Sequence, residues 1–199
     1  MSSELPASSP RAVGAAQPVS QEVLRLARRR LAAGGRLEMS ALAAELGVNR
    51  VTLYRWVGSR ERLLVEVLWS VADRAWRRLL SEVPDGPDRA ATVVLGFIEC
   101  VLAHPGMQHL LTVEPDLTMR LLTHRAAGFQ PRLLGAVEGL LREETAAGRL
   151  DVPIDTHELA YVVVRVIESY TYLDVLLGER PEAHRAEAAL RLLLGRRAT

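Results

Sequence analysis

Residues 39–60, MSALAAELGVNRVTLYRWVGSR, decide the fold of this chain. Leu42 and Leu46 recur at helical spacing, and Gly47 supplies the positive φ at which a helix commonly ends. Asn49 can then cap a following helix through its side-chain oxygen. The stretch therefore predicts two short helices joined by a tight turn.

The second of these helices is only about two turns long, which is too short to be stable alone in water. Its apolar side must therefore pack on neighbouring helices; that side comprises Val48, Leu53 and Val57. The opposite side faces outward and carries cationic, hydroxyl and aromatic groups. These are Arg50, Thr52 and Arg55, with Tyr54 and Trp56 beside them. Such a mixture suits a groove rimmed by phosphates, so we expect double-stranded DNA as the partner.

Residues 46–63, LGVNRVTLYRWVGSRERL, resemble the core of the TetR family of one-component regulators, and this resemblance spans roughly residues 20–70. The run YVVVRVIESY at 161–170 is similar to the branch of that family that controls quorum-signal degradation. Membership implies an all-α fold. An N-terminal helix-turn-helix then precedes a long connecting helix, and a helical C-terminal domain dimerises and binds a small molecule.

The resemblance also assigns contacts with DNA. It implies base or groove contacts at Arg50, Val51 and Thr52, and phosphate contacts at Tyr54, Trp56 and Arg60. The chemistry of Arg50 agrees, because its guanidinium can donate two hydrogen bonds to the O6 and N7 acceptors of guanine. Trp56 offers one indole N–H, which leaves open whether it contacts phosphate or packs.

The chain departs from the family pattern at Glu38, which stands where Ser or Thr commonly caps a helix and contacts phosphate. Ser40 is the candidate replacement hydroxyl, although it falls inside the first turn. The predicted DNA-binding residues are Ser40, Asn49, Arg50, Val51, Thr52, Tyr54, Arg55, Trp56 and Arg60.

All 25 basic side chains of this 199-residue chain are Arg. The lack of Lys excludes enzymes that use a lysine amine as a Schiff base, in a P-loop or as a general base. The single Cys100 cannot form an internal disulfide and no signal segment opens the chain, so we expect a cytoplasmic protein. No apolar run reaches the ~18 residues of a membrane span, so no membrane partner is expected.

Charge is distributed unevenly along the chain. Residues 20–62 hold nine Arg and four Glu, a balance of +5. Residues 63–199 hold fifteen Arg and nineteen acidic residues, a balance of −4. A basic N-terminal part on an acidic body is typical of a nucleic-acid-binding domain joined to a second domain. The alternative is a chance cluster of solvated Arg.

Composition and helical patterning divide the chain into three parts. Residues 1–18, rich in Ser, Pro and Ala, lack apolar periodicity and predict a disordered tail. Residues 19–66 form the predicted helix-turn-helix DNA-binding domain. Residues 67–199 form the predicted helical domain for ligand binding and dimerisation.

Two further helices are expected beside the helix-turn-helix, a supporting helix before it and a long connecting helix after it. The first, over about 21–33, has arginines that we expect to neutralise DNA phosphates; they are Arg25, Arg28 and Arg29. A longer helix is predicted over about 59–81 and is ended by the turn residues 84–87. Its Trp69 and Trp76 lie on one face, so they either pack between the domains or line a ligand pocket.

The remainder of the chain shows helical patterning without strand-period alternation. Helices are predicted over about 88–103, just after Pro105, and over about 116–123, 131–147, 156–177 and 182–194. The last two are expected to form a four-helix dimer interface, two helices from each subunit. The alternative is that they pack only within one subunit.

Cys100 and His104 lie one turn apart on one predicted helix, and His109 and His124 follow. A metal site needs three or four ligands, and this set offers neither a second Cys nor a second paired His. No metal or other cofactor is therefore expected. We expect these side chains to line the core or a small-molecule pocket.

The predicted pocket combines such polar groups with apolar neighbours. Its predicted ligand-binding residues are Phe97, Cys100, Val101, His104, Met107, Met119, His124, Phe129, Val164, Arg165 and Glu168. Arg165 and Glu168, three residues apart in an apolar helix, are either a structural ion pair or the polar clamp of the pocket.

These patterns predict a ligand-responsive transcriptional regulator and not an enzyme. The chain is expected to act as a homodimer that represses from a near-palindromic operator and is released by a small molecule. The branch resemblance implies a lactone or similar acyl compound as that effector. Two other classes stay open at this point: a small helical enzyme that uses Cys100 and the histidines, and an adaptor that binds another protein through its C-terminal helices.

Overall fold

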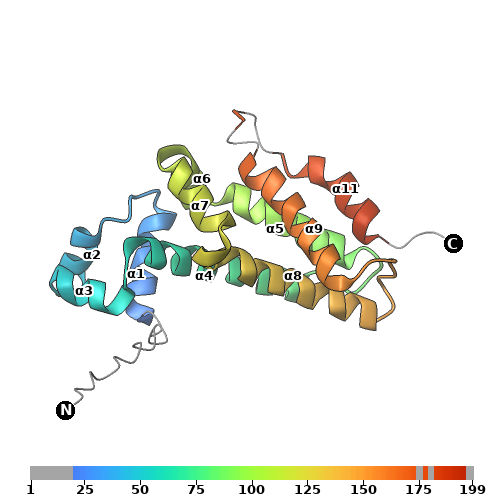
Figure 1. Cartoon of the computed structure of the whole chain (residues 1–199), viewed down its shortest axis with the longest axis horizontal. Helices are drawn as coiled ribbons and strands as arrows, with labels where there is room; N and C mark the ends of the chain where they lie inside the picture. The colour runs from blue at the N-terminus through green and yellow to red at the C-terminus, as the bar shows by residue number, and fades with distance from the viewer. Residues whose placement is uncertain (1–19, 174–176, 179–181, 196–199) are drawn as a thin grey trace, which may run out of the picture.

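The structure is a computed structural model that describes residues 20–173, 177–178 and 182–195. Within those residues every regular element is a helix, which confirms the predicted all-α fold. The tail predicted over 1–18 lies outside the described residues. Figure 1 shows a small helical unit at one end of the molecule, joined by one long helix to a larger body.

The N-terminal unit consists of α1 (Gln21–Ala32), α2 (Met39–Glu45) and α3 (Arg50–Val57). Its core is formed by fully or nearly fully buried apolar side chains: Val23, Leu26, Leu31, Leu42, Leu53 and Val57. Between α2 and α3, Gly47 has a φ of 67°. Oδ1 of Asn49 accepts a hydrogen bond from the backbone N–H of Thr52 at 2.7 Å. The predicted turn and helix cap are thus confirmed, and they fix the direction in which α3 leaves α2.

The connecting helix α4 (Arg60–Glu82) runs from the N-terminal unit into the body (Figure 1). Its two tryptophans pack edge-to-face on phenylalanines of the body. The ring centroids of Trp69 and Phe129 are 5.9 Å apart, and those of Trp76 and Phe97 are 5.3 Å apart. Aromatic pairs of this geometry stabilise a core beyond their buried area. The tryptophans therefore pack in the core as predicted, but they pack α4 onto the body and not the two domains onto each other.

The body contains the remaining helices. They are α5 (Arg89–Ala103), α6 (Pro105–Val113), α7 (Pro115–Thr123), η1 (Arg125–Ala127), α8 (Phe129–Ala146), α9 (Thr156–Glu168), η2 (Ser169–Leu173) and α11 (His184–Leu194). In Figure 1, α4 and α8 run along one side of the body, and α5, α9 and α11 cover them. The short helices α6 and α7 stand over the junction with the N-terminal unit.

Helix ends in the body follow from local sequence. Pro105 and Pro115 occupy the first turns of α6 and α7, where a missing N–H costs no intrahelical hydrogen bond. The helix predicted over 156–177 is shorter than expected: α9 ends at Glu168, η2 follows as a π-helical turn, and residues 174–176 lie outside the described residues.

No single helix in the described part of the chain is long and apolar enough to span a membrane. The helices α5 and α6 reach the required length only as a pair, and that pair is bent by 63° at its junction.

A close contact between α1 and α6 holds the N-terminal unit against the body. Gly106 packs on the end of α1 so tightly that a Cβ placed there would lie 2.3 Å from the carbonyl oxygen of Leu31. Only glycine fits at this distance, because real Cβ atoms do not approach a backbone oxygen so closely. The backbones of α6 and α1 are therefore in direct contact at Gly106.

The far end of the body is held by a buried carboxylate. Glu144 on α8 is 1% exposed and accepts hydrogen bonds from Arg149 at 2.7 Å and from Arg89 on α5 at 2.6 Å. These two guanidinium groups hold the pKa of Glu144 below its ordinary value against the opposing effect of burial.

Candidate DNA-binding and ligand-binding sites

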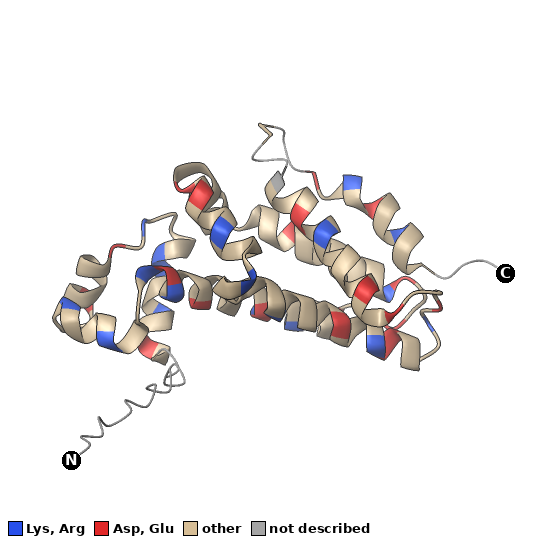
Figure 2. Ribbon diagram, in the orientation of Figure 1, with Lys and Arg blue, Asp and Glu red and all other residues tan. Residues whose placement is uncertain are grey.

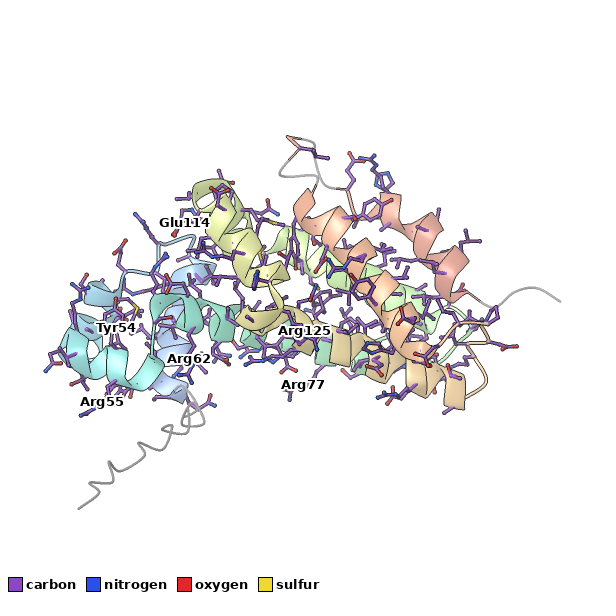
Figure 3. The ribbon with its side chains drawn as sticks, in the orientation of Figure 1. Tyr54, Arg55, Arg62, Arg77, Glu114 and Arg125 are labelled. Atoms are coloured by element: carbon purple, nitrogen blue, oxygen red, sulfur yellow. The ribbon has the colours of Figure 1, made fainter. Side chains whose placement is uncertain are left out.

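The helix α3 presents its polar side to solvent at the outer end of the molecule. Its apolar side chains Leu53 and Val57 are fully buried, as predicted, whereas Val51 is 78% exposed and Arg50 and Arg55 are exposed. Figure 2 shows the basic segments of α3 at this end, and Figure 3 shows Arg55 on its outer side. This exposed set can enter the major groove of a duplex without any change in the packing of the helix.

The remaining predicted DNA-binding residues surround this set. The guanidinium of Arg50 lies over the ring of Tyr54, 5.9 Å from its centroid, so both side chains occupy one side of α3. Trp56 is 37% exposed. Ser40 is exposed in the first turn of α2. Asn49 is exposed too, but its side-chain oxygen is already used to cap α3.

The structure gives Arg60 partners other than the phosphate predicted for it. Its Nη atoms donate two hydrogen bonds to the carboxylate of Glu114, at 2.6 and 2.9 Å, and its Nε donates to the carbonyl oxygen of Leu37 at 2.9 Å. The hydrogen bonds from Arg60 hold the pKa of Glu114 below its ordinary value. Arg60 therefore ties the start of α4 to the α6–α7 junction, where Figure 3 places Glu114.

This pairing was not predicted from the sequence. Glu114 is 54 positions away from Arg60 along the chain, and no local pattern connects the two residues. A bidentate Arg–carboxylate pair is among the stronger and more directional polar contacts in proteins. The phosphate contact assigned to Arg60 by resemblance stays a prediction, and Arg60 has these partners within the protein beside it.

A small apolar cavity lies where α1, α4, α5, α6 and α8 converge. Six of its lining residues were predicted: Phe97, Cys100, Val101, His104, Met107 and Phe129. The others that line it come mainly from α1 and α4: Leu31, Leu68, Val71, Ala72, Ala75 and Tyr172. The cavity holds about 30 Å³. That volume suits about one water molecule, so a larger ligand must push the walls apart.

Five residues predicted for the pocket lie away from this cavity. They are Met119, His124, Val164, Arg165 and Glu168. His124 is exposed beyond the end of α7, and Val164 packs in the core around α9. The reason is geometric, because helical spacing places a residue on a face of its own helix but does not fix which neighbour that face meets.

Arg165 and Glu168 contact each other and neighbouring side chains of the body. Nη1 of Arg165 lies 2.8 Å from Oε2 of Glu168, and its guanidinium stacks over the ring of Tyr161, 5.0 Å from the centroid. The side-chain amide of Gln130 on α8 donates to Oε1 of Glu168 at 3.3 Å. Burial nevertheless raises the pKa of Glu168. Of the two predicted roles, these contacts match the structural ion pair.

Cys100 and His104 are both engaged within the fold. Nδ1 of His104 accepts a hydrogen bond from the backbone N–H of Met107 at 3.3 Å, and burial lowers the pKa of this imidazole. Sγ of Cys100 accepts a hydrogen bond from Nη2 of Arg78 at 3.1 Å. Among the described residues, no group of three or more His, Cys, Asp or Glu could hold a metal ion.

The sequence profile of the tetracyclin repressor-like C-terminal domain matches residues 85–195, which is more than half of the chain. The chain belongs to the TetR family. A TetR-family protein is a transcriptional regulator with a helix-turn-helix DNA-binding unit and a helical ligand-binding body. Both parts are present in the architecture described above.

Solved structures of similar fold include several regulators. The R. erythropolis transcriptional repressor QsdR, of the TetR family, superposes with a TM-score of 0.78 at 27% identity, covering 90% of this chain and 96% of its own. The Bacillus subtilis regulator FadR, solved with stearoyl-CoA, gives a TM-score of 0.59 at 15% identity, covering 87% and 96%. The multidrug binding protein EbrR gives 0.55 at 20% identity, covering 90% and 96%. No functionally curated protein matches the sequence.

Proposed function

We propose that this TetR-family regulator is a repressor, a homodimer that binds a near-palindromic operator and leaves it when a small molecule enters the C-terminal body. The observation that carries the proposal is that Leu31, near the end of α1, forms part of the cavity wall. A ligand that enlarges the cavity must displace Leu31 and with it the helix that supports α3. The structural similarity to the repressor QsdR supports repression over activation.

Base recognition is assigned to the exposed side of α3. Arg50 donates to guanine, while Val51 and the Thr52 methyl lie against thymine methyl groups. Tyr54 and Trp56 donate to flanking phosphates, and these contacts fix the register of the helix in the groove. Ser40, Asn49 and Arg55 contact the adjoining sugar-phosphate backbone of the DNA.

The proposed dimer interface is formed by α9 and α11, and one dimer binds each operator. Large apolar side chains on these helices face outward in one subunit: Tyr161 is 48% exposed, Val162 37% and Leu192 86%. Such a patch is covered when α9 and α11 pack against the same helices of a second copy. Two copies of α3 then enter successive major grooves about 34–36 Å apart, which explains why the operator is near-palindromic.

Release follows from the contacts between the cavity and the N-terminal unit. The cavity must grow from about 30 Å³ to several hundred Å³ to hold an acyl chain or lactone. Its expansion moves α6 through Met107, and Gly106 of the same helix abuts α1. The far end of α6 is joined to α4 through Glu114 and Arg60. The ligand therefore favours a dimer in which the two α3 helices have the wrong separation for DNA.

A selection from random duplex DNA tests the proposal. The full-length protein is used for the selection, the enriched pool is sequenced, and binding is repeated over a salt series. We expect an inverted repeat whose affinity falls steeply with salt, because each neutralised phosphate releases counterions. A ten-carbon lactone or acyl compound added to the complex should then release it. Failure to enrich any sequence, or binding that is flat over the salt series, contradicts the proposed DNA-binding function.

A further inference from the structure

A hollow lined by arginines lies directly outside the apolar cavity. It is bounded by α1, α4, the end of α5 and the start of α6, and it encloses about 760 Å³. Its cationic lining residues come from two helices that pack side by side: Arg25, Arg28 and Arg29 of α1, and Arg74 and Arg78 of α4. Figure 1 shows α1 against α4 at this junction. We call this feature the arginine hollow.

Most of this positive charge lacks a close counter-charge in the described part of the chain. Three of the arginines make no ion pair with any described residue; they are Arg25, Arg28 and Arg74. The other two have loose and solvated partners: Glu45 at 3.7 Å from Arg29, and Glu82 at 3.6 Å from Arg78. Guanidinium groups that converge without carboxylates create a positive potential, which an anion relieves.

The arginine hollow and the apolar cavity share a wall. Four residues line both spaces: Val71, Ala75, Cys100 and His104. The guanidinium of Arg78 reaches this wall, where Nη2 donates to Sγ of Cys100 at 3.1 Å. A molecule with one charged end and one apolar end can therefore lie across the wall, with its charge among the arginines and its chain in the cavity.

DNA bound by α3 does not account for the arginine hollow. Arg74 lies fourteen residues beyond Arg60 on α4, which is about 21 Å along the helix and away from α3. The hollow also reaches Ala103 and Pro105 of the body. Although Arg25, Arg28 and Arg29 were predicted to neutralise phosphates, the structure places all three beside body residues.

We infer that the effector is an acyl chain with an anionic headgroup, a carboxylate or a phosphate, and that Arg74 and Arg78 hold the headgroup together with the α1 arginines. Arg binds both anions through paired N–H donors of fixed geometry. The acyl chain crosses the shared wall and displaces Leu31 in the cavity. This inference deepens the proposed function, on which it rests, by assigning a charge to the ligand. A closed lactone is neutral and leaves the arginines without a partner.

Ligand binding can be measured on the full-length protein without DNA. Trp76 packs on Phe97 in the cavity wall, so tryptophan fluorescence reports entry of a chain. Decanoate, decyl phosphate, methyl decanoate and the ten-carbon lactone are titrated below their aggregation limits. We expect the two anions to bind at least tenfold more tightly than the ester and the lactone. Equal affinity for decanoate and methyl decanoate overturns the inference.

The double variant Arg74→Ala and Arg78→Ala locates the headgroup. Both side chains are exposed, so the fold should persist, and circular dichroism checks this. We expect the variant to bind decanoate about as weakly as methyl decanoate, with ester binding unchanged. Arg120→Ala with Arg142→Ala, on exposed residues elsewhere in the body, serves as the matched control and should retain the preference for the anion. Retention of that preference in the arginine-hollow variant overturns the assignment.

Separate arms distinguish the possible failures. Inorganic phosphate at the same concentrations tests whether a free anion suffices; saturation of the hollow without an acyl chain contradicts an amphiphilic effector. If the arginine-hollow variant loses DNA affinity while binding decanoate normally, the hollow serves DNA and the inference is wrong. If decanoate binds as expected but never releases selected DNA, the ligand inference stands and the proposed release mechanism fails.

Discussion

Arg50 and Arg60 are the same residue type ten positions apart, and their surroundings give them different roles. Arg50 is exposed on α3 and its only described contact is with the ring of Tyr54, so its donors remain available to a base. The side chain of Arg60 is 19% exposed, and its donors are bound to Glu114 and to a backbone carbonyl. Resemblance in sequence predicts a DNA contact for both, and the structure leaves the donors of Arg50 without a hydrogen-bond partner among the described residues, whereas those of Arg60 have partners within the protein.

Replacement of Arg50 by Ala should weaken operator binding by about 1–3 kcal/mol and relax the preference at one base position. Fluorescence anisotropy on the selected operator and on single-base variants measures both effects. Arg142→Ala removes an exposed arginine of α8 that pairs with Glu138, and it should leave both unchanged. A uniform loss over all DNA sequences, with a flatter salt slope, would show that Arg50 contacts phosphate instead.

The Arg60–Glu114 pair should contribute to stability in a pH-dependent way. The folded-state pKa of Glu114 is lowered by Arg60, so its contribution is fully present above the ordinary carboxyl pKa and is lost as the pH falls through the lowered value. Glu114→Gln should therefore reduce the free energy of unfolding by about 1–3 kcal/mol at neutral pH. Urea denaturation from pH 7 to pH 3 should show the difference from wild type shrinking with acidity. A difference that is constant over this range contradicts the assignment.

At the scale of elements, α6 is the part of the body that contacts the N-terminal unit most directly. Its first turn abuts α1 through Gly106, and its end is joined to α4 through Glu114. Its Met107 lines the cavity between these two contacts. A helix of nine residues is short enough to move as a rigid unit, and both of its ends would then act on the helices that position α3.

Gly106→Ala should force α6 away from α1, since its Cβ would lie 2.3 Å from a backbone oxygen. We expect a loss of about 1–3 kcal/mol in stability, measured by urea denaturation, and a change in operator affinity without any change at α3. Gly135→Ala is the matched control, because a Cβ at that exposed position of α8 meets nothing within 4 Å. That control should stabilise the protein by about 0.5–1 kcal/mol. Equal effects of the two substitutions would contradict the proposed close contact.

At the scale of the whole molecule, the proposed function makes DNA recognition depend on two subunits. One α3 offers few base contacts, whereas two at a fixed separation restrict binding to sites with the matching spacing. The exposed apolar side chains on α9 and α11 supply the surface for such an assembly. In the proposed homodimer, the packing of α9 and α11 would therefore set the distance between the two recognition helices.

Leu192→Arg should convert the homodimer to monomer, because it places a charge in the centre of the proposed apolar interface. Light scattering after size-exclusion chromatography measures the molar mass of the protein in solution. Operator affinity should fall together with that mass. Val113→Arg makes the same change at a 51% exposed position of α6 outside the proposed interface, and it should leave the mass unchanged. A Leu192→Arg protein that remains dimeric would place the interface elsewhere.

Local sequence was sufficient to predict the helices, the turn between α2 and α3, and the family. Gly47 and Asn49 act on their immediate neighbours, and helical periodicity separates Leu53 and Val57 from Arg50, so short-range chemistry suffices. Five of the six predicted residues that line the cavity lie on α5, on α6 or at the junction between them, because these helices are adjacent both in sequence and in space; the sixth, Phe129, lies on α8. Such features are readable without knowing how distant parts of the chain meet.

Tertiary structure alone decided which surfaces meet. The sequence does not pair Arg60 with Glu114, does not place Leu31 in the cavity wall, and does not bring the α1 and α4 arginines around one hollow. Each of these contacts joins residues more than twenty positions apart, and helical spacing carries no information about the partner of a face. The physical reason is that periodicity specifies which side of a helix is buried. The packing of the complete core decides which neighbouring helix that side meets.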